Sequence, residues 1–168
     1  IIFAGDNGLA VGQHGLMGKQ NVYEHSVGVP LMIKAAAQHT GKKTADLCYL
    51  IDVFPTLCDM LQLPVPQSVD GISLLSSLDG KEPVRDYLYY SYMDNQRGIS
   101  DGTWKLIEYH VNGKRTTQLF NLKNDPWERN DLSGQKKYEK TIQRLREKMA
   151  EEQKRTNDTS VFWNNFSY

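Results

Sequence analysis

A carboxylate and an amide stand side by side at Asp6 and Asn7, directly after the apolar residues 1–4. A short apolar run ended by Gly5 is typical of a buried strand, and ligand sites in open α/β sheets lie just beyond the carboxyl ends of strands. Oxygen atoms of these two kinds suit Ca²⁺ or Mg²⁺, but such a cation needs six or more oxygen ligands, so the two residues supply only part of a site. By spacing alone, Asp-Asn-Gly at residues 6–8 also fits an ordinary turn.

The next residues, up to position 19, are rich in glycine and are interpreted as a long loop, the kind of segment that often carries function. His14 in this loop can act as an acid, a base or a hydrogen-bond donor. Lys19 at its end can hold an oxyanion as a point charge. Taken singly, each residue also fits a solvated loop position.

The order of the motifs is more specific than any one of them. In this order the sequence resembles the sulfatase family of the alkaline-phosphatase-like superfamily, over about residues 1–133. The matching stretches are I-F-A-G-D-N-G at 2–8, G-Q-H-G-L-M-G-K at 12–19, Y-E at 23–24, V-P-L at 29–31, I-D-V-F-P-T-L at 51–57, D-G-I-S-L at 70–74, W-K-L-I at 104–107, L-F-N-L at 119–122 and D-P-W-E-R-N at 125–130.

The resemblance implies a role for each residue singled out above. Asp6 and Asn7 would be calcium ligands, and Lys19 would hold the sulfate group or the bridging oxygen of the substrate. His14 would lie at the same pocket as a catalytic or substrate-binding residue. Arg97 would reach the leaving group, although a solvated arginine at a strand end is the alternative for this position. The implied substrate is a sulfated small molecule or glycan, and the implied compartment is periplasmic, secreted or lysosomal.

The resemblance also implies parts that lie elsewhere. In this family acidic residues nearer the N-terminus complete the calcium site, and the nucleophile is a formylglycine made from the first residue of a C/S-x-P/A-x-R motif. Residues 46–50 and 56–60, which contain the two cysteines, do not match that motif. We therefore expect no turnover by these 168 residues alone. A phosphodiesterase or phosphonate hydrolase of the same superfamily, and a non-catalytic remnant or binding module, remain as alternatives.

The elements that must position these residues fall into two parts. Residues 1–85 predict the end of an alkaline-phosphatase-like α/β domain, with buried strands at 1–4 and 29–33. A helix is expected to start near Phe54, with Pro55 in its first turn, where proline is tolerated.

Residues 86–168 predict a small antiparallel sheet with a packed helix. Asn112-Gly113 is a strong hairpin signal, and residues 136–155 have the apolar stripe of an amphipathic helix. The four expected strands are residues 87–92, 97–100, 104–110 and 115–122.

Composition excludes two kinds of partner. Lys plus Arg and Asp plus Glu are both 20, so the net charge is zero and nothing favours binding to nucleic acid. No apolar stretch approaches the roughly 20 residues that a membrane span needs. Cys48 and Cys58 lie among apolar residues and are interpreted as small buried hydrophobic side chains.

Overall fold

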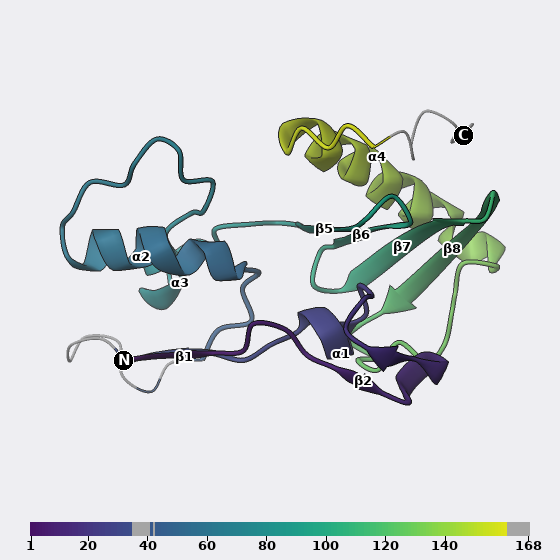
Figure 1. Cartoon of the computed structure of the whole chain (residues 1–168), viewed down its shortest axis with the longest axis horizontal. Coiled ribbons are helices and arrows are strands. Elements are labelled where there is room, and N and C mark those ends of the chain that lie inside the picture. Colours follow the sequence, from purple (N-terminus) through teal and green to yellow (C-terminus); the bar gives the residue numbers. More distant parts are fainter. Residues whose placement is uncertain (35–40, 42, 161–168) are drawn as a thin grey trace. The chain divides into compact units, whose positions relative to one another are not determined.

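The computed structural model of the chain describes residues 1–34, 41 and 43–160. It contains two compact units, one built from Ile1–Asp6 with Val29–Leu88, and the other from Asn7–Gly28 with the chain from Tyr89 onward (Figure 1). The second boundary lies close to the predicted division between residues 85 and 86. The segment Asn7–Gly28 groups with the C-terminal unit, and the division into residues 1–85 and 86–168 stays a prediction.

The first unit contains the two strands expected near the N-terminus. Strand β1 (Ile2–Ala4) pairs antiparallel with β4 (Leu31–Ile33). The expectation that they are buried is wrong for the described chain, because Phe3 is 58% and Met32 59% exposed. The two strands form a sheet of their own, and a two-stranded ribbon is too small to bury both of its faces.

Two helices follow in the same unit. The one-turn 3-10 helix η3 (Leu50–Asp52) leads into α2 (Val53–Met60), so Pro55 lies in the first turn of α2, as predicted. Helix α3 (Leu75–Leu78) comes after the D-G-I-S-L stretch. Both thiols are free. Cys58 is buried in α2, and Cys48 is half-buried.

The D-x-x-P-T motif at residues 52–56 ties these helices together. The fully buried Asp52 carboxylate accepts a hydrogen bond from the Ile72 amide at 2.8 Å and pairs with Arg85. The Thr56 hydroxyl donates to the Asp52 carbonyl and accepts from the Leu74 amide at 2.9 Å. The motif is therefore structural, because it joins α2 to the segment before α3.

The second unit is built on a four-stranded sheet in the order β5-β6-β7-β8. The predicted sheet is confirmed, and β6–β7 and β7–β8 pair antiparallel. Asn112 and Gly113 both have positive φ, 52° and 74°, as a two-residue hairpin turn requires. The strands are β5 (Leu88–Tyr92), β6 (Gln96–Ser100), β7 (Trp104–Val111) and β8 (Lys114–Asn121).

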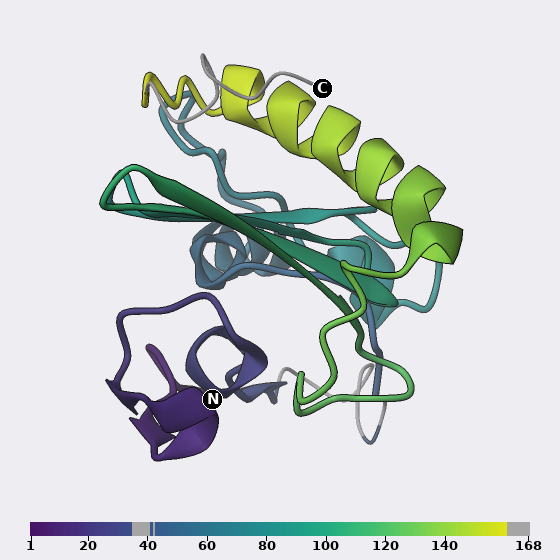
Figure 2. The ribbon, with the colours of Figure 1, turned by 90° about the vertical axis from the view of Figure 1, so that its right-hand side faces the viewer.

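Different elements pack on the two faces of this sheet (Figure 2). Helix α4 (Glu139–Arg155), which follows the 3-10 turn η4 (Lys136–Tyr138), packs on one face and confirms the predicted amphipathic helix. It buries the side chains of Ile142, Leu145 and Met149. No helix among the described residues is long and apolar enough to cross a membrane.

The opposite face is covered by the segment Asn7–Gly28. Val22 and Tyr23 of this segment form a buried cluster with Ile107 of β7 and Phe120 of β8. The expectation of a loop up to residue 19 is wrong in part, because short regular elements lie in that stretch, and a helix follows it. These are β2 (Ala10–Val11) paired with β3 (Met17–Gly18), the 3-10 turn η1 (Gln13–Gly15) and helix α1 (Glu24–Val27).

Candidate functional site

Two of the predicted site residues lie in direct contact. The Lys19 ammonium Nζ donates to Asn7 Oδ1 at 3.0 Å, across 12 residues of chain. Asn7 Nδ2 donates to the Gly8 carbonyl at 2.9 Å, which fixes the orientation of the amide. The amide oxygen of Asn7 is therefore the atom turned toward the Lys19 ammonium.

Gly8 explains why the segment follows this path. Its amide donates to the Ser26 carbonyl at 2.9 Å, and a Cβ at this position would lie 2.0 Å from the His25 carbonyl oxygen. Such a distance is a steric clash with backbone, so only glycine lets the chain pass this close to α1. The Asp-Asn-Gly sequence thus lies where two segments of the chain pack closely together, and it does not form an ordinary turn.

Asp6 is the last residue of the first unit's opening segment, and it is exposed. The amide of the preceding Gly5 donates to the Pro30 carbonyl at 3.2 Å, which extends the backbone pairing of β1 with β4. The carboxylate of Asp6 and the amide oxygen of Asn7 have the donor chemistry of a calcium site. Among the described residues no group of three His, Cys, Asp or Glu side chains could hold a metal ion. Calcium binding by Asp6 and Asn7 stays a prediction.

His14 lies in a stack of three aromatic rings. Its imidazole is parallel to the Tyr23 ring, with 4.0 Å between centroids and 2° between planes, and it lies 5.6 Å from the His25 ring. His14 Nε2 lies 3.2 Å from the Trp127 carbonyl oxygen, so this nitrogen carries the proton when the bond forms. The backbone of His14 is left-handed, with φ 52°. His14 is therefore held in a defined orientation on the sheet face that carries Lys19.

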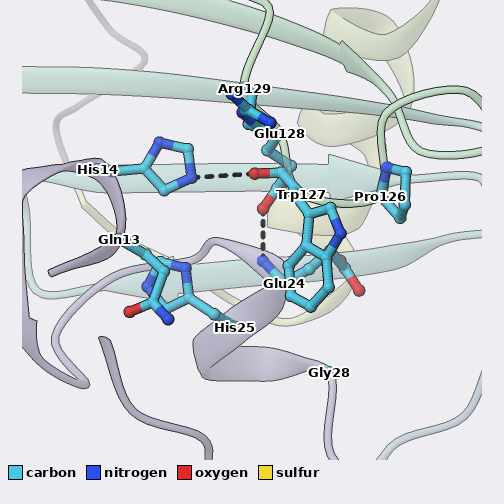
Figure 3. A pocket seen from close by; sticks show the side chains of 9 residues that line it. All are labelled: Gln13, His14, Glu24, His25, Gly28, Pro126, Trp127, Glu128 and Arg129. Carbon is cyan, nitrogen blue, oxygen red and sulfur yellow. Dashed lines mark hydrogen bonds between the residues drawn. The ribbon is translucent and has the colours of Figure 1, made fainter. Parts of the chain in front are cut away.

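His14 also lines a pocket of about 660 Å³ within the second unit (Figure 3). Burial lowers the pKa of His25, and the positive charges of His14 and Lys105 lower it further, so the neutral ring is favoured there. The pocket is lined by Gln13, His14, Glu24, His25, Gly28, Pro126, Trp127, Glu128 and Arg129.

A buried ion triad underlies this pocket. The Lys105 side chain is 0% exposed, and its Nζ lies 2.8 Å from Glu24 Oε1 and 3.1 Å from Glu128 Oε1. Glu128 Oε2 accepts the backbone N–H of Glu24, the first residue of α1, at 2.6 Å. Burial nevertheless raises the pKa of Glu128, because desolvation outweighs the attraction of Lys105. The triad holds α1, and with it the Asn7–Gly28 segment, against β7.

The sequence pattern alone did not predict this triad. Glu24, Lys105 and Glu128 were part of the motifs that carry the resemblance, but a lone lysine in a strand is usually a surface residue. One available signal was the period-two alternation of strands. It places Lys105 on the same face as the buried Ile107, where a charge requires a partner.

Arg97 has a different environment from the one expected. The alternative of a solvated strand-end arginine is wrong, because Arg97 lies inside β6 and is 2% exposed. Its guanidinium donates to both carboxylate oxygens of Asp158, at 2.6 and 3.1 Å, and to the carbonyls of Met93 and Gln96. Contact of Arg97 with a substrate stays a prediction, and these bonds show what such a contact would have to displace.

A family comparison covers most of the chain. The model described as N-sulphoglucosamine sulphohydrolase, C-terminal, matches residues 12–155. An N-acetylglucosamine-6-O-sulfatase of Bacteroides thetaiotaomicron is 29% identical over 171 residues, 94% of this chain and 30% of that protein. Arylsulfatase K of Homo sapiens is 26% identical over 75% of this chain and 26% of that protein. The chain thus spans about a third or less of the length of these relatives.

Solved structures agree with this result. A protein determined in complex with its substrate D-glucosamine-2-N,6-O-disulfate matches 97% of this chain and 35% of its own, with a TM-score of 0.78 and 27% identity. The phosphonate monoester hydrolase of Agrobacterium radiobacter matches 90% of this chain and 34% of its own, with a TM-score of 0.75 and 25% identity. With the fold, the order of its motifs and the family match together, the chain belongs to the N-sulphoglucosamine sulphohydrolase C-terminal family, the C-terminal part of sulfatases.

Proposed function

We propose that the protein carrying this chain is a sulfatase that hydrolyses sulfate esters, and that this chain provides one side of its site. The observation that carries the proposal is the contact between Lys19 Nζ and Asn7 Oδ1 at 3.0 Å. It unites a cation suited to a sulfate group with an oxygen suited to calcium, at the positions that the sulfatase motifs specify.

The charge of the substrate explains why these groups belong together. A sulfate monoester is an anion, and further negative charge develops on the leaving oxygen as the S–O bond breaks. The Lys19 ammonium would neutralise this charge and orient the ester, and one such contact typically contributes about 10²–10³ in rate. Calcium, held in part by Asp6 and Asn7, would add Lewis-acid stabilisation when bound. His14, fixed by its stack on Tyr23, would form the wall of the pocket beside Lys19.

The nucleophile, a formylglycine, and the remaining calcium ligands are expected in other parts of the protein. A sulfated glycan is the favoured substrate class, because two relatives in the comparisons act on sulfated amino sugars according to their names. A secreted, periplasmic or lysosomal compartment follows from the same family. Phosphonate hydrolysis is the second candidate, supported by the similarity to the Agrobacterium enzyme.

Substitution of Lys19 tests the proposal in the full-length protein. We expect Lys19→Ala to lower kcat/KM for 4-nitrophenyl sulfate at least about tenfold, because it removes the charge that meets the sulfate. Lys34→Ala, at another exposed lysine, is the matched control. An unchanged kcat/KM for Lys19→Ala would remove this residue from the site. Faster hydrolysis of an aryl phosphonate than of the aryl sulfate by the unmodified protein would favour the second candidate.

A further inference from the structure

We propose that a second pocket, on the face of the sheet that carries the Asn7–Gly28 segment, binds the sugar ring of a sulfated glycan. The inference rests on the proposed sulfatase function and adds the place where the leaving group is recognised. The pocket has a volume of about 340 Å³ and lies within the second unit. This volume is within the range of small-molecule sites, roughly 300–1,000 Å³.

Two segments that are distant in sequence form its walls. Gln20, Asn21 and Tyr23 come from the segment between β3 and α1, while Gln96 and Tyr109 come from β6 and β7. Gln96 and Tyr109 are paired in the sheet register, so their side chains stand on the same face. The pocket is thus formed by the packing of the segment onto the sheet.

Polar side-chain atoms in the pocket lining can still form hydrogen bonds with a ligand. The Gln96 Oε1 atom is buried and accepts no hydrogen bond from the described residues, although its Nε2 donates to the Gln20 carbonyl at 3.5 Å. The Tyr109 hydroxyl is also buried, and it interacts with the hydroxyl of Tyr23. The neighbouring Tyr23 hydroxyl donates its proton to Gln118 Oε1 at 2.7 Å. Buried polar groups are normally satisfied, so the Gln96 oxygen, which lacks a partner among the described residues, points to a ligand.

A sugar ring fits this chemistry better than an apolar or cationic ligand does. Each sugar hydroxyl both donates and accepts, so one ring can donate to Gln96 Oε1 and to the oxygen of the Tyr109 hydroxyl. Tyr109 and Val111 in the lining offer an apolar surface beside these polar atoms. The described lining contains no carboxylate and has one lysine, Lys114, so a sulfated or carboxylated sugar would meet no repulsion.

The position of the pocket along the chain fits a leaving group. Gln20 lines the pocket and directly follows Lys19, the residue proposed to hold the sulfate. Adjacent Cα atoms are about 3.8 Å apart. The chain therefore runs from the residue proposed to hold the sulfate directly into the pocket wall.

The test uses the full-length protein and its Gln96→Leu and Tyr109→Phe variants. Substrates are a panel of 6-O-sulfated disaccharides from heparin and chondroitin sulfate, compared with 4-nitrophenyl sulfate, which has no sugar. We expect each variant to raise KM for the preferred disaccharide about tenfold and to leave kcat within about twofold. Values for 4-nitrophenyl sulfate should not change. Tyr92→Phe is the control, because Tyr92 packs on the same cluster outside the pocket lining.

Titration calorimetry with the same disaccharides separates this inference from the proposed function, because binding does not require turnover. Tenfold weaker binding to both variants would support the pocket even if the protein hydrolysed no sulfate ester. The pocket assignment is overturned if the unmodified protein binds none of the disaccharides or if the variants bind them as tightly. It is equally overturned if both substrates lose the same factor, since that result indicates a structural role. Loss of hydrolysis with sugar binding intact would count against the sulfatase proposal alone.

Discussion

Replacing Lys105 with methionine removes the charge at the centre of the buried triad while keeping most of the side-chain volume. Lys105 is 0% exposed, the Glu128 side chain 1% and the Glu24 side chain 32%. Glu24 can regain water, so its share of the loss is small. Glu128 cannot, and breaking a buried pair by removing one partner typically costs about 3–5 kcal/mol. We expect the opening free energy of α1 to fall by about 3 kcal/mol.

Hydrogen exchange of the full-length protein, followed by mass spectrometry, measures this change. A loss of about 3 kcal/mol corresponds to exchange about 150-fold faster in the peptides that cover α1. Lys140→Met, at an exposed position of α4, provides the control. Adding Glu128→Gln to Lys105→Met should restore part of the loss, because the double variant leaves no unpaired buried charge.

The destabilisation caused by Lys105→Met should depend on pH through the protonation of Glu128. Burial already raises the pKa of Glu128 with Lys105 present, and removal of Lys105 raises it further. The variant therefore carries its full penalty above that pKa and loses it as the pH falls and Glu128 takes up a proton. The destabilisation should be smaller at about pH 5 than at about pH 8. A loss below about 0.5 kcal/mol, or an equal loss at both pH values, would refute the assignment of Glu128 as a buried charge held by Lys105.

Three further predictions concern the same unit of the full-length protein. Gly8→Ala should destabilise the Asn7–Gly28 segment by about 2 kcal/mol in hydrogen exchange, because its Cβ would meet the His25 carbonyl oxygen at 2.0 Å, and exchange at the unmodified rate would contradict this. Arg97→Met should lower the opening free energy of β6 by about 3 kcal/mol with kcat/KM reduced less than threefold, whereas a large loss of kcat/KM with β6 exchange unchanged would identify a substrate contact. Burial lowers the pKa of His25 below 6.5, so the contribution of His25 to stability is present above pH 6.5 and is lost as the pH falls below that value. We expect His25→Gln to make the melting temperature less dependent on pH between about pH 5 and 7.5. A variant whose melting temperature depends on pH as strongly as that of the unmodified protein would contradict this.

Local patterns predicted the elements well. Asn112-Gly113 and the alternating residues around it located the hairpin of β7 and β8, because left-handed φ values favour these two residue types. The stripe of Ile142, Leu145 and Met149 predicted α4 and the face that it buries. Pro55 marked the first turn of α2. Each of these signals depends on neighbours within a few residues, so tertiary packing did not change the element that the local sequence favours.

For the candidate site, the sequence selected the residues but did not predict which of them are buried. The order of motifs was enough to select Asp6, Asn7, His14 and Lys19, because a series of spacings is improbable by chance. The exposure of a charged side chain to solvent could not be predicted from the order of motifs. Arg97 has the sequence context of a strand-end cation, yet it is buried because Asp158, 61 residues away, supplies its counter-charge. An ion pair across such a separation leaves no local pattern in the sequence.

The sequence by itself therefore determined the family and the secondary structure of the C-terminal unit, and it predicts the residues that would hold a sulfate ester. Only the tertiary structure decided that the Asn7–Gly28 segment packs on the sheet. The reason is physical: Gly8 permits a backbone contact at α1 that any Cβ would prevent, and Lys105 requires two carboxylates from distant parts of the chain. Both conditions involve partners in three dimensions, and they set the position of Asn7 and Lys19 next to each other.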